Sequence, residues 1–415
     1  MKGKQMKYMR VSIFLLISIM SYLFSQEHEI LTNAKVSTED QHFNIVVDGN
    51  NRFAFALLQH LNKQYKGNIV CSSYSIASGL SRLALGAKGT TLNQIRQILN
   101  YSMSFNPLIG SLDQFFVTIP KEKNGSQVFL ANSVWLQKDV SVIPAYQYAY
   151  KKNYFSELQK INFKENSVNS LKEINDWTLK QTNNRIHNIV SPQAFSENNQ
   201  FILTTSFYLK GTWRKMFPVG KTTRKPFYIN SSQVRQVDMM HTLGQYPILI
   251  TEKLTMIEIP YLTQEGTTPD FSLVILLPKE QMGWQTILEE LNLENWKNWT
   301  KNLTPQSIKL SLPCFRIEQK LQLNSVLQAL GAKELFTPQA DLTGITREKL
   351  QLSHAIHKTL IHVAEEGSDS KAWGVNMEEP EDSSMQELLI DHPFFFLIIE
   401  RSTHSILSIG RVLQP

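Results

Sequence analysis

The sequence contains very little cysteine: Cys71 and Cys314 are the only two among 415 residues. So low a count excludes a disulfide framework, and a chain of this length can bury a large core without such cross-links. Both cysteines lie in apolar surroundings, in Asn-Ile-Val-Cys and Leu-Pro-Cys-Phe. We therefore expect two buried free thiols in preference to one bridge.

The common catalytic motifs are absent. The chain has no Gly-x-Ser-x-Gly, His-Glu-x-x-His, Gly-x-Gly-x-x-Gly, Cys-x-x-Cys or Gly-x-x-x-x-Gly-Lys-Ser/Thr sequence. The ten histidines are scattered, and the pair nearest to a ligand spacing is His354 and His357. These two come just before an expected strand, where a separation of three places them on opposite faces. The sequence thus predicts no cofactor and no metal site, and it disfavours an enzyme.

The only long apolar run near the N-terminus, residues 11–24, is too short for a membrane span of about 20 residues. Four basic residues precede it, no acid occurs before Glu27, and the small Ser25 follows it. This order is typical of a secretory signal peptide over residues 1–25, with an uncleaved anchor as the alternative. We expect a secreted protein, extracellular or periplasmic, with residues 26–415 as one domain and no membrane association after cleavage.

The net charge gives no reason to expect a nucleic-acid partner. Residues 1–25 contain four of the 42 basic residues and none of the 36 acids, so the remaining chain carries a net charge of +2. The basicity therefore belongs mostly to the predicted signal peptide.

Helix-like and strand-like segments follow each other without repeats or a clear domain boundary. Apolar residues spaced by three and four predict a helix near 54–61, and a second helix over 76–85 should end at Gly86 as its C-cap. Helices are also expected over 171–180 and 326–330, and strands over 128–136, 201–213, 271–277, 307–312, 394–400 and 406–412. One mixed α+β domain fits this order best.

Residues 367–386 form a long segment without helical or strand periodicity. It carries an acidic cluster around Pro380 and ends shortly before the apolar run 394–399. Unstructured loops longer than about 12–15 residues are uncommon in compact domains and are usually functional or disordered.

Ten short blocks, spread in order over more than 340 residues, resemble the serpin family. They are Asn-Ile-Val-Cys-Ser at 68–72 with Ser75-Ile76, Leu-Gly-Ala-Lys-Gly-Thr-Thr at 85–91, Ala-Asn-Ser-Val-Trp-Leu at 131–136, Ile-Asn-Asp-Trp at 174–177 with Thr182 and Ile186, Phe-Tyr-Leu-Lys-Gly-Thr-Trp at 207–213, Leu-Leu-Pro at 276–278, Leu-Pro at 312–313 with Phe315, Leu-Phe at 335–336 with Ala-Asp-Leu at 340–342, Glu-Glu-Gly at 365–367, and Asp-His-Pro-Phe at 391–394 with Gly-Arg-Val at 410–412. The resemblance implies three β-sheets, about eight or nine helices and an exposed reactive-centre loop at about 365–390.

The resemblance also implies a suicide mechanism rather than an enzymatic activity. A protease attacks the exposed loop, an acyl-enzyme forms, and the freed loop inserts as a new strand of the largest sheet, which distorts the tethered protease. A non-inhibitory carrier, chaperone or storage role is the alternative. In either case we expect a monomer.

The hinge of the loop shows the alternation that insertion requires. The resemblance places the hinge at Glu365, Glu366, Gly367, Ser368, Asp369, Ser370, Lys371 and Ala372. Counted from Gly367, the inward positions Ser368, Ser370 and Ala372 are small, whereas the charged Asp369 and Lys371 point outward. This parity favours insertion, but the bulky Trp373 should slow it and favour substrate behaviour.

The attacked bond is predicted from two family spacings, which differ by one residue. The count from Glu365 gives Glu381–Asp382, whereas the count back from Pro393 gives Asp382 as the specificity residue. An acid at this position requires a pocket with a basic group, because an apolar pocket would have to desolvate the carboxylate. We expect an acid-preferring serine protease as the partner, with an Asp-specific cysteine protease or cleavage at Met377 or Met385 as alternatives.

Further positions carry over from the family as sites of conformational control. Ser72, Ser75 and His357 match the shutter beneath the large sheet, and Thr205 stands where an asparagine is usual. The next two positions belong to the breach at the top of that sheet. Trp213 matches its tryptophan, and Cys314 replaces a basic residue that often faces Glu365.

Overall fold

The computed structural model describes residues 41–117, 126–154, 157–164, 167–192, 200–262, 270–368 and 385–415. The predicted signal peptide lies outside these residues, as do Asp369, Ser370, Lys371, Ala372, Glu381 and Asp382. Residues from Asp40 to the C-terminus form one compact unit. No helix among the described residues combines the length and apolarity that a membrane crossing requires.

Nine α-helices lie within the described ranges. They are α2 (Gln41–Gln64), α3 (Ser73–Ala84), α4 (Gly89–Ile98), α5 (Phe105–Val117), α6 (Pro144–Tyr154), α7 (Ser167–Gln181), α8 (Trp284–Glu290), α9 (Leu293–Lys301) and α10 (Asn324–Leu330). Helix α3 begins because the Ser72 hydroxyl accepts a hydrogen bond from the Ser75 amide, as an N-cap residue does. Helix α10 ends at Gly331, whose φ of 126° suits glycine.

The prediction for the end of α3 was wrong in its mechanism. Leu85 is the C-cap residue and is right-handed, and Gly86 does not have a positive φ. A side chain at Gly86 would instead overlap Ile345 and press on Tyr146. Gly86 is therefore required by close packing rather than by its backbone conformation.

One sheet has seven strands, in the order β11-β12-β5-β3-β4, with β2 and β13 also paired to β5. Their bounds are β2 (Ser126–Leu130), β3 (Ser133–Gln137), β4 (Gln159–Ile161), β5 (Phe201–Thr212), β11 (Phe315–Gln322), β12 (His354–Val363) and β13 (Gly367–Ser368). Every residue of β5 except Lys210 is buried, including the polar run Thr204, Thr205 and Ser206 at its middle. Strand β5 is therefore the central element of this sheet.

The other sheet has nine strands, in the order β1-β16-β15-β9-β8-β7-β10-β14, with β6 paired to β7. Their bounds are β1 (Ile69–Cys71), β6 (Thr223–Asn230), β7 (Gln233–Ile250), β8 (Leu254–Pro260), β9 (Phe271–Pro278), β10 (Thr304–Pro313), β14 (Gln386–Leu389), β15 (Phe394–Glu400) and β16 (Ser405–Val412). The 18-residue β7 joins two groups of strands, since its first residues pair with β6, its residues 239–248 pair with β10 and its last residues pair with β8. The second and third predicted sheets are thus continuous through β7.

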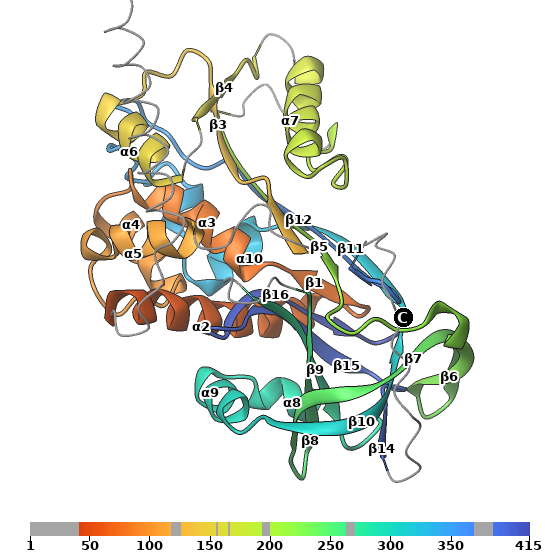
Figure 1. Cartoon of the computed structure of the whole chain (residues 1–415). Coiled ribbons are helices and arrows are strands. Elements are labelled where there is room, and N and C mark those ends of the chain that lie inside the picture. The colour runs from red at the N-terminus through yellow and green to blue at the C-terminus, as the bar shows by residue number, and fades with distance from the viewer. Residues whose placement is uncertain are drawn as a thin grey trace, which may run out of the picture. The chain divides into compact units, whose positions relative to one another are not determined.

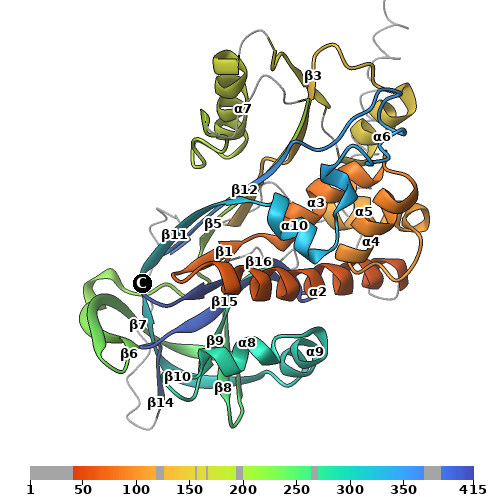
Figure 2. The same cartoon turned by 180° about the vertical axis from the view of Figure 1, so that it is seen from behind.

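Helices α3, α4, α5, α6 and α10 gather on one side of this unit, and strands β6, β7, β10 and β14 lie on the other (Figures 1 and 2). Helices α2 and α3 pack on β16, and α3 also packs on β5. Helix α7 covers the seven-stranded sheet, where Trp177 meets Trp135 edge to face with ring centroids 5.3 Å apart. Ile174 of α7 shares this core cluster with Ile202 of β5 and Ile356 of β12.

Two further expectations need correction. The strand predicted over 128–136 is two strands, β2 and β3, separated at Ala131 and Asn132. His354 and His357 lie within β12 rather than before it. Both cysteines are free as predicted, and Cys71 is buried, but Cys314 is only half-buried.

Candidate functional site

The candidate site is the seam between the parallel strands β5 and β12 of the seven-stranded sheet. These strands pair from His354 with Ile202 to Leu360 with Tyr208. Beyond that point β13 pairs with β5, Gly367 opposite Thr212 and Ser368 opposite Gly211. Because β2 occupies the other edge of β5 at Gly211, β13 lies on the same edge as β12. The start of the predicted hinge therefore already forms strand pairs in this sheet.

Ser368 is fully buried at this position. Its hydroxyl oxygen lies 2.7 Å from the phenolic oxygen of Tyr261. The inward orientation predicted for Ser368 from strand alternation is the one that the structure has. Gly367 precedes it with a φ of 141°, and a side chain there would overlap the carbonyl oxygen of Gly211. Only glycine fits this backbone.

Trp213 connects the hinge to the top of the seam, as the resemblance implied. Its indole Nε1 donates to the Ala364 carbonyl at 2.8 Å, and its backbone amide donates to the Glu366 carbonyl at 3.1 Å. Its ring stacks on Tyr261, with centroids 4.4 Å apart and an interplanar angle of 17°. Trp213 and Tyr261 thus hold opposite ends of the short segment Ala364–Ser368. Tyr261 carried no motif in the sequence, so it was missed.

Glu365 begins the hinge and is held by the turn that follows β5. Its backbone carbonyl accepts from the Phe217 amide at 3.0 Å, and its carboxylate accepts from the Thr222 hydroxyl at 2.8 Å. Cys314 lies near enough for the negative charges of Glu365 and Asp238 to act on its thiol. Burial, with these charges, raises the pKa of Cys314 to about 12. At neutral pH the thiol is therefore protonated and cannot pair with the carboxylate as a basic residue would.

His357 occupies the centre of the shutter and is fully buried. The Ser72 amide donates to its Nε2 at 3.0 Å, so Nε2 is an acceptor and the neutral ring carries its proton on Nδ1. That proton is donated to the Thr205 hydroxyl, 3.0 Å away. Burial lowers the pKa of His357 to about 3. The shutter histidine is therefore neutral. Protonation would place a proton on Nε2, which could then no longer accept the hydrogen bond from the Ser72 amide.

Asn132 is a second centre of the shutter, and the sequence analysis did not assign it. Its Oδ1 accepts from the Ser75 hydroxyl at 2.7 Å and from the Ser206 amide at 3.1 Å. Its Nδ2 donates to the Ser75 carbonyl at 3.3 Å. The residue joins α3 to β5 at the break between β2 and β3. The only signal for it was its place in the block at 131–136, which carried no role.

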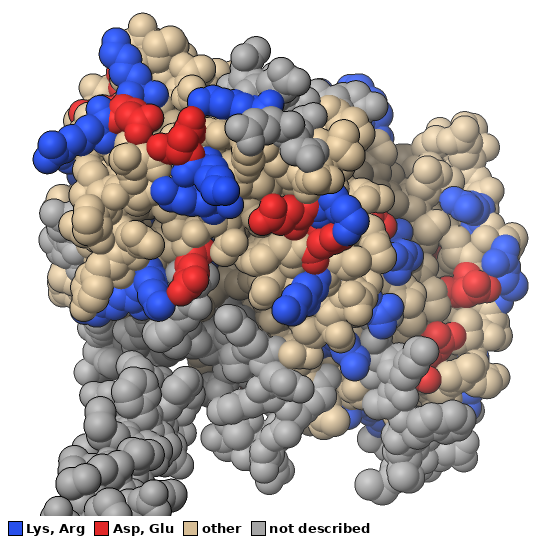
Figure 3. Space-filling view, turned by 90° about the horizontal axis from the view of Figure 1, so that it is seen from above, with Lys and Arg blue, Asp and Glu red and all other residues tan. Residues whose placement is uncertain are grey.

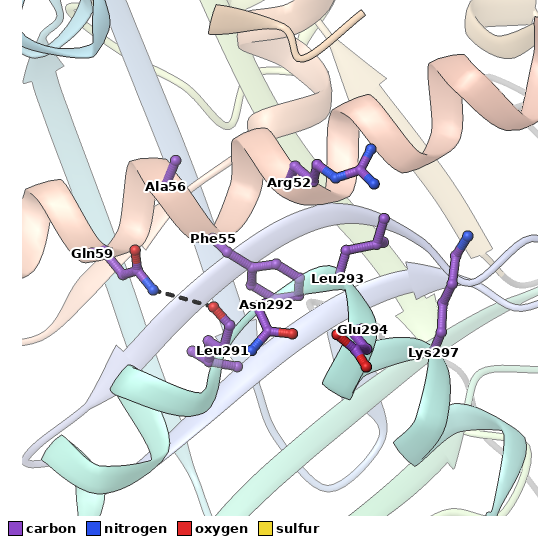
Figure 4. Close-up of a pocket in the computed structure, with 9 residues that line it drawn as sticks. All are labelled: Arg52, Phe55, Ala56, Gln59, Leu291, Asn292, Leu293, Glu294 and Lys297. Atoms are coloured by element: carbon purple, nitrogen blue, oxygen red, sulfur yellow. Dashed lines mark hydrogen bonds between the residues drawn. The ribbon is translucent and has the colours of Figure 1, made fainter. Parts of the chain in front are cut away.

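A separate hollow of about 670 Å³ lies between α2 and α9 (Figure 4). Phe55 and Leu293 contribute apolar surface, and Gln59 Nε2 donates to the Leu291 carbonyl at 3.1 Å. None of the predicted site residues lines this hollow. Elsewhere in the described ranges, no three His, Cys, Asp or Glu side chains are grouped so that they could hold a metal ion.

The arrangement defines a class of protein in which a long loop begins inside the seven-stranded sheet, at the end of the seam between β5 and β12. Comparison with known proteins agrees. The Serpin (serine protease inhibitor) family matches residues 48–415. The chain belongs to the serpin family.

The relatives cover nearly the whole chain. Serpin B3 of Homo sapiens is 30% identical over 394 residues, 90% of this chain and 100% of the relative. Leukocyte elastase inhibitor A of Mus musculus is 32% identical over 382 residues, 88% of this chain and 98% of the relative. The structure of uncleaved ovalbumin superposes with a TM-score of 0.81 at 27% identity and covers 89% of this chain and 100% of ovalbumin. Serpins are mostly protease inhibitors rather than enzymes, although some members do not inhibit.

Proposed function

We propose that this chain is a secreted, monomeric suicide inhibitor of a serine protease that prefers an acidic residue at the cleaved bond. The observation that carries the inhibitory role is the position of Ser368. This first inward residue of the hinge is buried and paired with β5 at the end of the β5–β12 seam. After cleavage, extension of β13 along β5 would need no change of strand register.

The preference for an acidic residue rests on the sequence of the bait, the part of the predicted reactive-centre loop that the protease would cleave. Both predicted specificity residues, Glu381 and Asp382, are acidic, and both lie outside the described residues. A complementary protease pocket would offer a basic side chain, because burying a carboxylate without a partner costs several kcal/mol. Secretion rests on the signal-like residues 1–25.

A non-inhibitory role is the second candidate, and Trp373 is the observation that favours it. A bulky side chain in the hinge slows insertion, and deacylation then completes before the protease is distorted. The same protein would be cleaved as a substrate and released.

The deciding experiment is incubation of the purified protein with a Glu-specific serine protease, followed by a denaturing gel. An inhibitor gives a covalent band at the summed mass, and mass spectrometry of the released peptide locates the bond. Clean cleavage without that band, and without a gain in thermal stability afterwards, contradicts the proposal.

A further inference from the structure

One segment of the chain carries a strong excess of positive charge. Between Lys210 and Arg235 there is no Asp or Glu, although the chain has 36 acids in all. The segment contains seven basic residues: Lys210, Arg214, Lys215, Lys221, Arg224, Lys225 and Arg235. It runs from the end of β5 through the hairpin formed by β6 and the first part of β7. We call this hairpin, residues 223–240, the cationic hairpin; its one acid, Asp238, forms an exposed ion pair with Arg224.

Two cations of the hairpin are exposed and form no ion pair among the described residues. They are Lys225 and Arg235. Lys225 lies opposite Val237 and Arg235 lies opposite Phe227 in the β6–β7 register. Residues opposite each other share a face of a sheet, as do residues two apart on one strand, so Lys225 and Arg235 lie on the same face, together with the buried Phe227 and Val237.

Away from this segment, exposed cations and anions of the described residues form pairs. In the view of Figure 3, Lys and Arg side chains are interspersed with Asp and Glu side chains. Three exposed ion pairs illustrate the mixture: Lys151 with Glu157, Lys164 with Asp139, and Lys172 with Asp176. The charge of the hairpin segment is therefore a local feature rather than a property of the whole surface.

The cationic segment holds both ends of the predicted bait. Before the bait, Phe217 and Thr222 bind Glu365 through the two hydrogen bonds described above. After the bait, the amide of Tyr228 in β6 donates to the carbonyl of Asp391 at 2.7 Å. A protease domain of about 230 residues has a radius of gyration of about 17 Å. A protease that grips the chain between these anchors would overhang the hairpin.

We propose that the cationic hairpin is a docking surface for the target protease, and that this protease is acidic around the entrance to its active site. The inference rests on the proposed inhibitory function. Exposed rim charges mainly set the association rate, which electrostatic steering can raise by about 10- to 1,000-fold. Screening by salt removes this effect, because the Debye length falls from about 10 Å at 0.1 M to about 3 Å at 1 M.

The test compares association rates with two forms of one probe. The probe is a Glu-specific serine protease, used as it is and as an engineered form with four added acidic residues around its active-site entrance. The inhibitor is used as the wild type, as the double variant K225E/R235E, and as K152E/K180E. Lys152 on α6 and Lys180 on α7 are exposed, so this control makes the same charge change away from the hairpin.

At low salt the wild type should react at least ten times faster with the acidic form of the protease than with the unmodified form. K225E/R235E should lose this preference, K152E/K180E should keep it, and 1 M salt should abolish it in all three. The yield of covalent complex should be the same for the three proteins, because the hairpin affects encounter and not insertion. Thermal unfolding midpoints within the error of the wild type verify that the variants are folded.

Equal rates of the wild type with both protease forms overturn the docking surface. So does loss of the preference in K152E/K180E, since that result assigns the effect to net charge alone. If K225E/R235E only weakens retention on a sulfated polysaccharide, the hairpin binds a polyanion and the proposal is wrong. Failure of every form to give a covalent complex contradicts the inhibitory function instead, so the two failures are distinguishable.

Discussion

Ser368 and Tyr261 join the predicted hinge to the sheet by a hydrogen bond of 2.7 Å between two buried hydroxyl groups. Tyr261 is itself fixed, because its amide donates to the Phe271 carbonyl and its ring stacks on Trp213. The predicted reactive-centre loop thus begins at a fixed point in the sheet. The contact makes the hinge testable independently of any protease.

Replacement of Ser368 by arginine should abolish the covalent complex and leave cleavage of the bait intact. The position is fully buried, and burying a guanidinium there without a partner would cost several kcal/mol. A denaturing gel with the Glu-specific protease measures both products. Ser102→Arg, at an exposed site, is the control and should behave as the wild type. A complex formed by Ser368→Arg would refute our assignment of the hinge.

Tyr261→Phe should loosen the hinge while it preserves the aromatic packing on Trp213. Loss of one buried hydroxyl contact is worth about 1 kcal/mol, which corresponds to a factor of about 5 in an opening equilibrium. Hydrogen exchange of the peptide that contains Gly367 and Ser368 should accelerate by about that factor. Tyr148→Phe is the matched control, because Tyr148 is 70% exposed. Unchanged exchange in Tyr261→Phe would mean that strand pairing alone holds the hinge.

Local sequence patterns predicted the elements whose causes are local. The strand expected over 201–213 is β5 (Phe201–Thr212), because apolar residues at 201–203 and 207–209 mark both halves of the strand. The strand expected over 128–136 is broken in two, because Asn132 uses its amide to bind Ser75 and Ser206, which belong to other elements. Periodicity contains no information about such a partner, so the break could not be foreseen.

The candidate site also contains features that the sequence predicted and features that it did not. The inward parity of Ser368 follows from the period of a strand, and the family resemblance placed Trp213 near Glu365. The hydrogen bond that Ser368 forms with Tyr261, 107 residues away in the chain, could not be foreseen from that period. The family resemblance placed Thr205 beside His357, but the tautomer of the ring became clear only from the Ser72 amide.

Thr205→Val should destabilise the shutter, because the variant keeps the shape of threonine but removes the acceptor of the His357 Nδ1 proton. A buried donor left without a partner costs about 1–3 kcal/mol. The midpoint of urea unfolding should therefore fall, and Thr205→Ser, which retains the hydroxyl, should fall less. Equal midpoints for the valine and serine variants would show that the hydroxyl contributes nothing.

Acidification should lower the free energy of unfolding through His357. Burial lowers its folded-state pKa to about 3, whereas the unfolded value is about 6.5. Below pH 6.5 the unfolded chain therefore binds a proton that the folded protein does not, and the free energy of unfolding falls as pH falls. The loss is about 1.4 kcal/mol per pH unit until the folded-state pKa is reached.

Urea unfolding at pH 7, 6 and 5 measures this slope. His357→Gln should reduce this slope by the contribution of one group. If His357→Gln retains the full slope, His357 is not the group responsible.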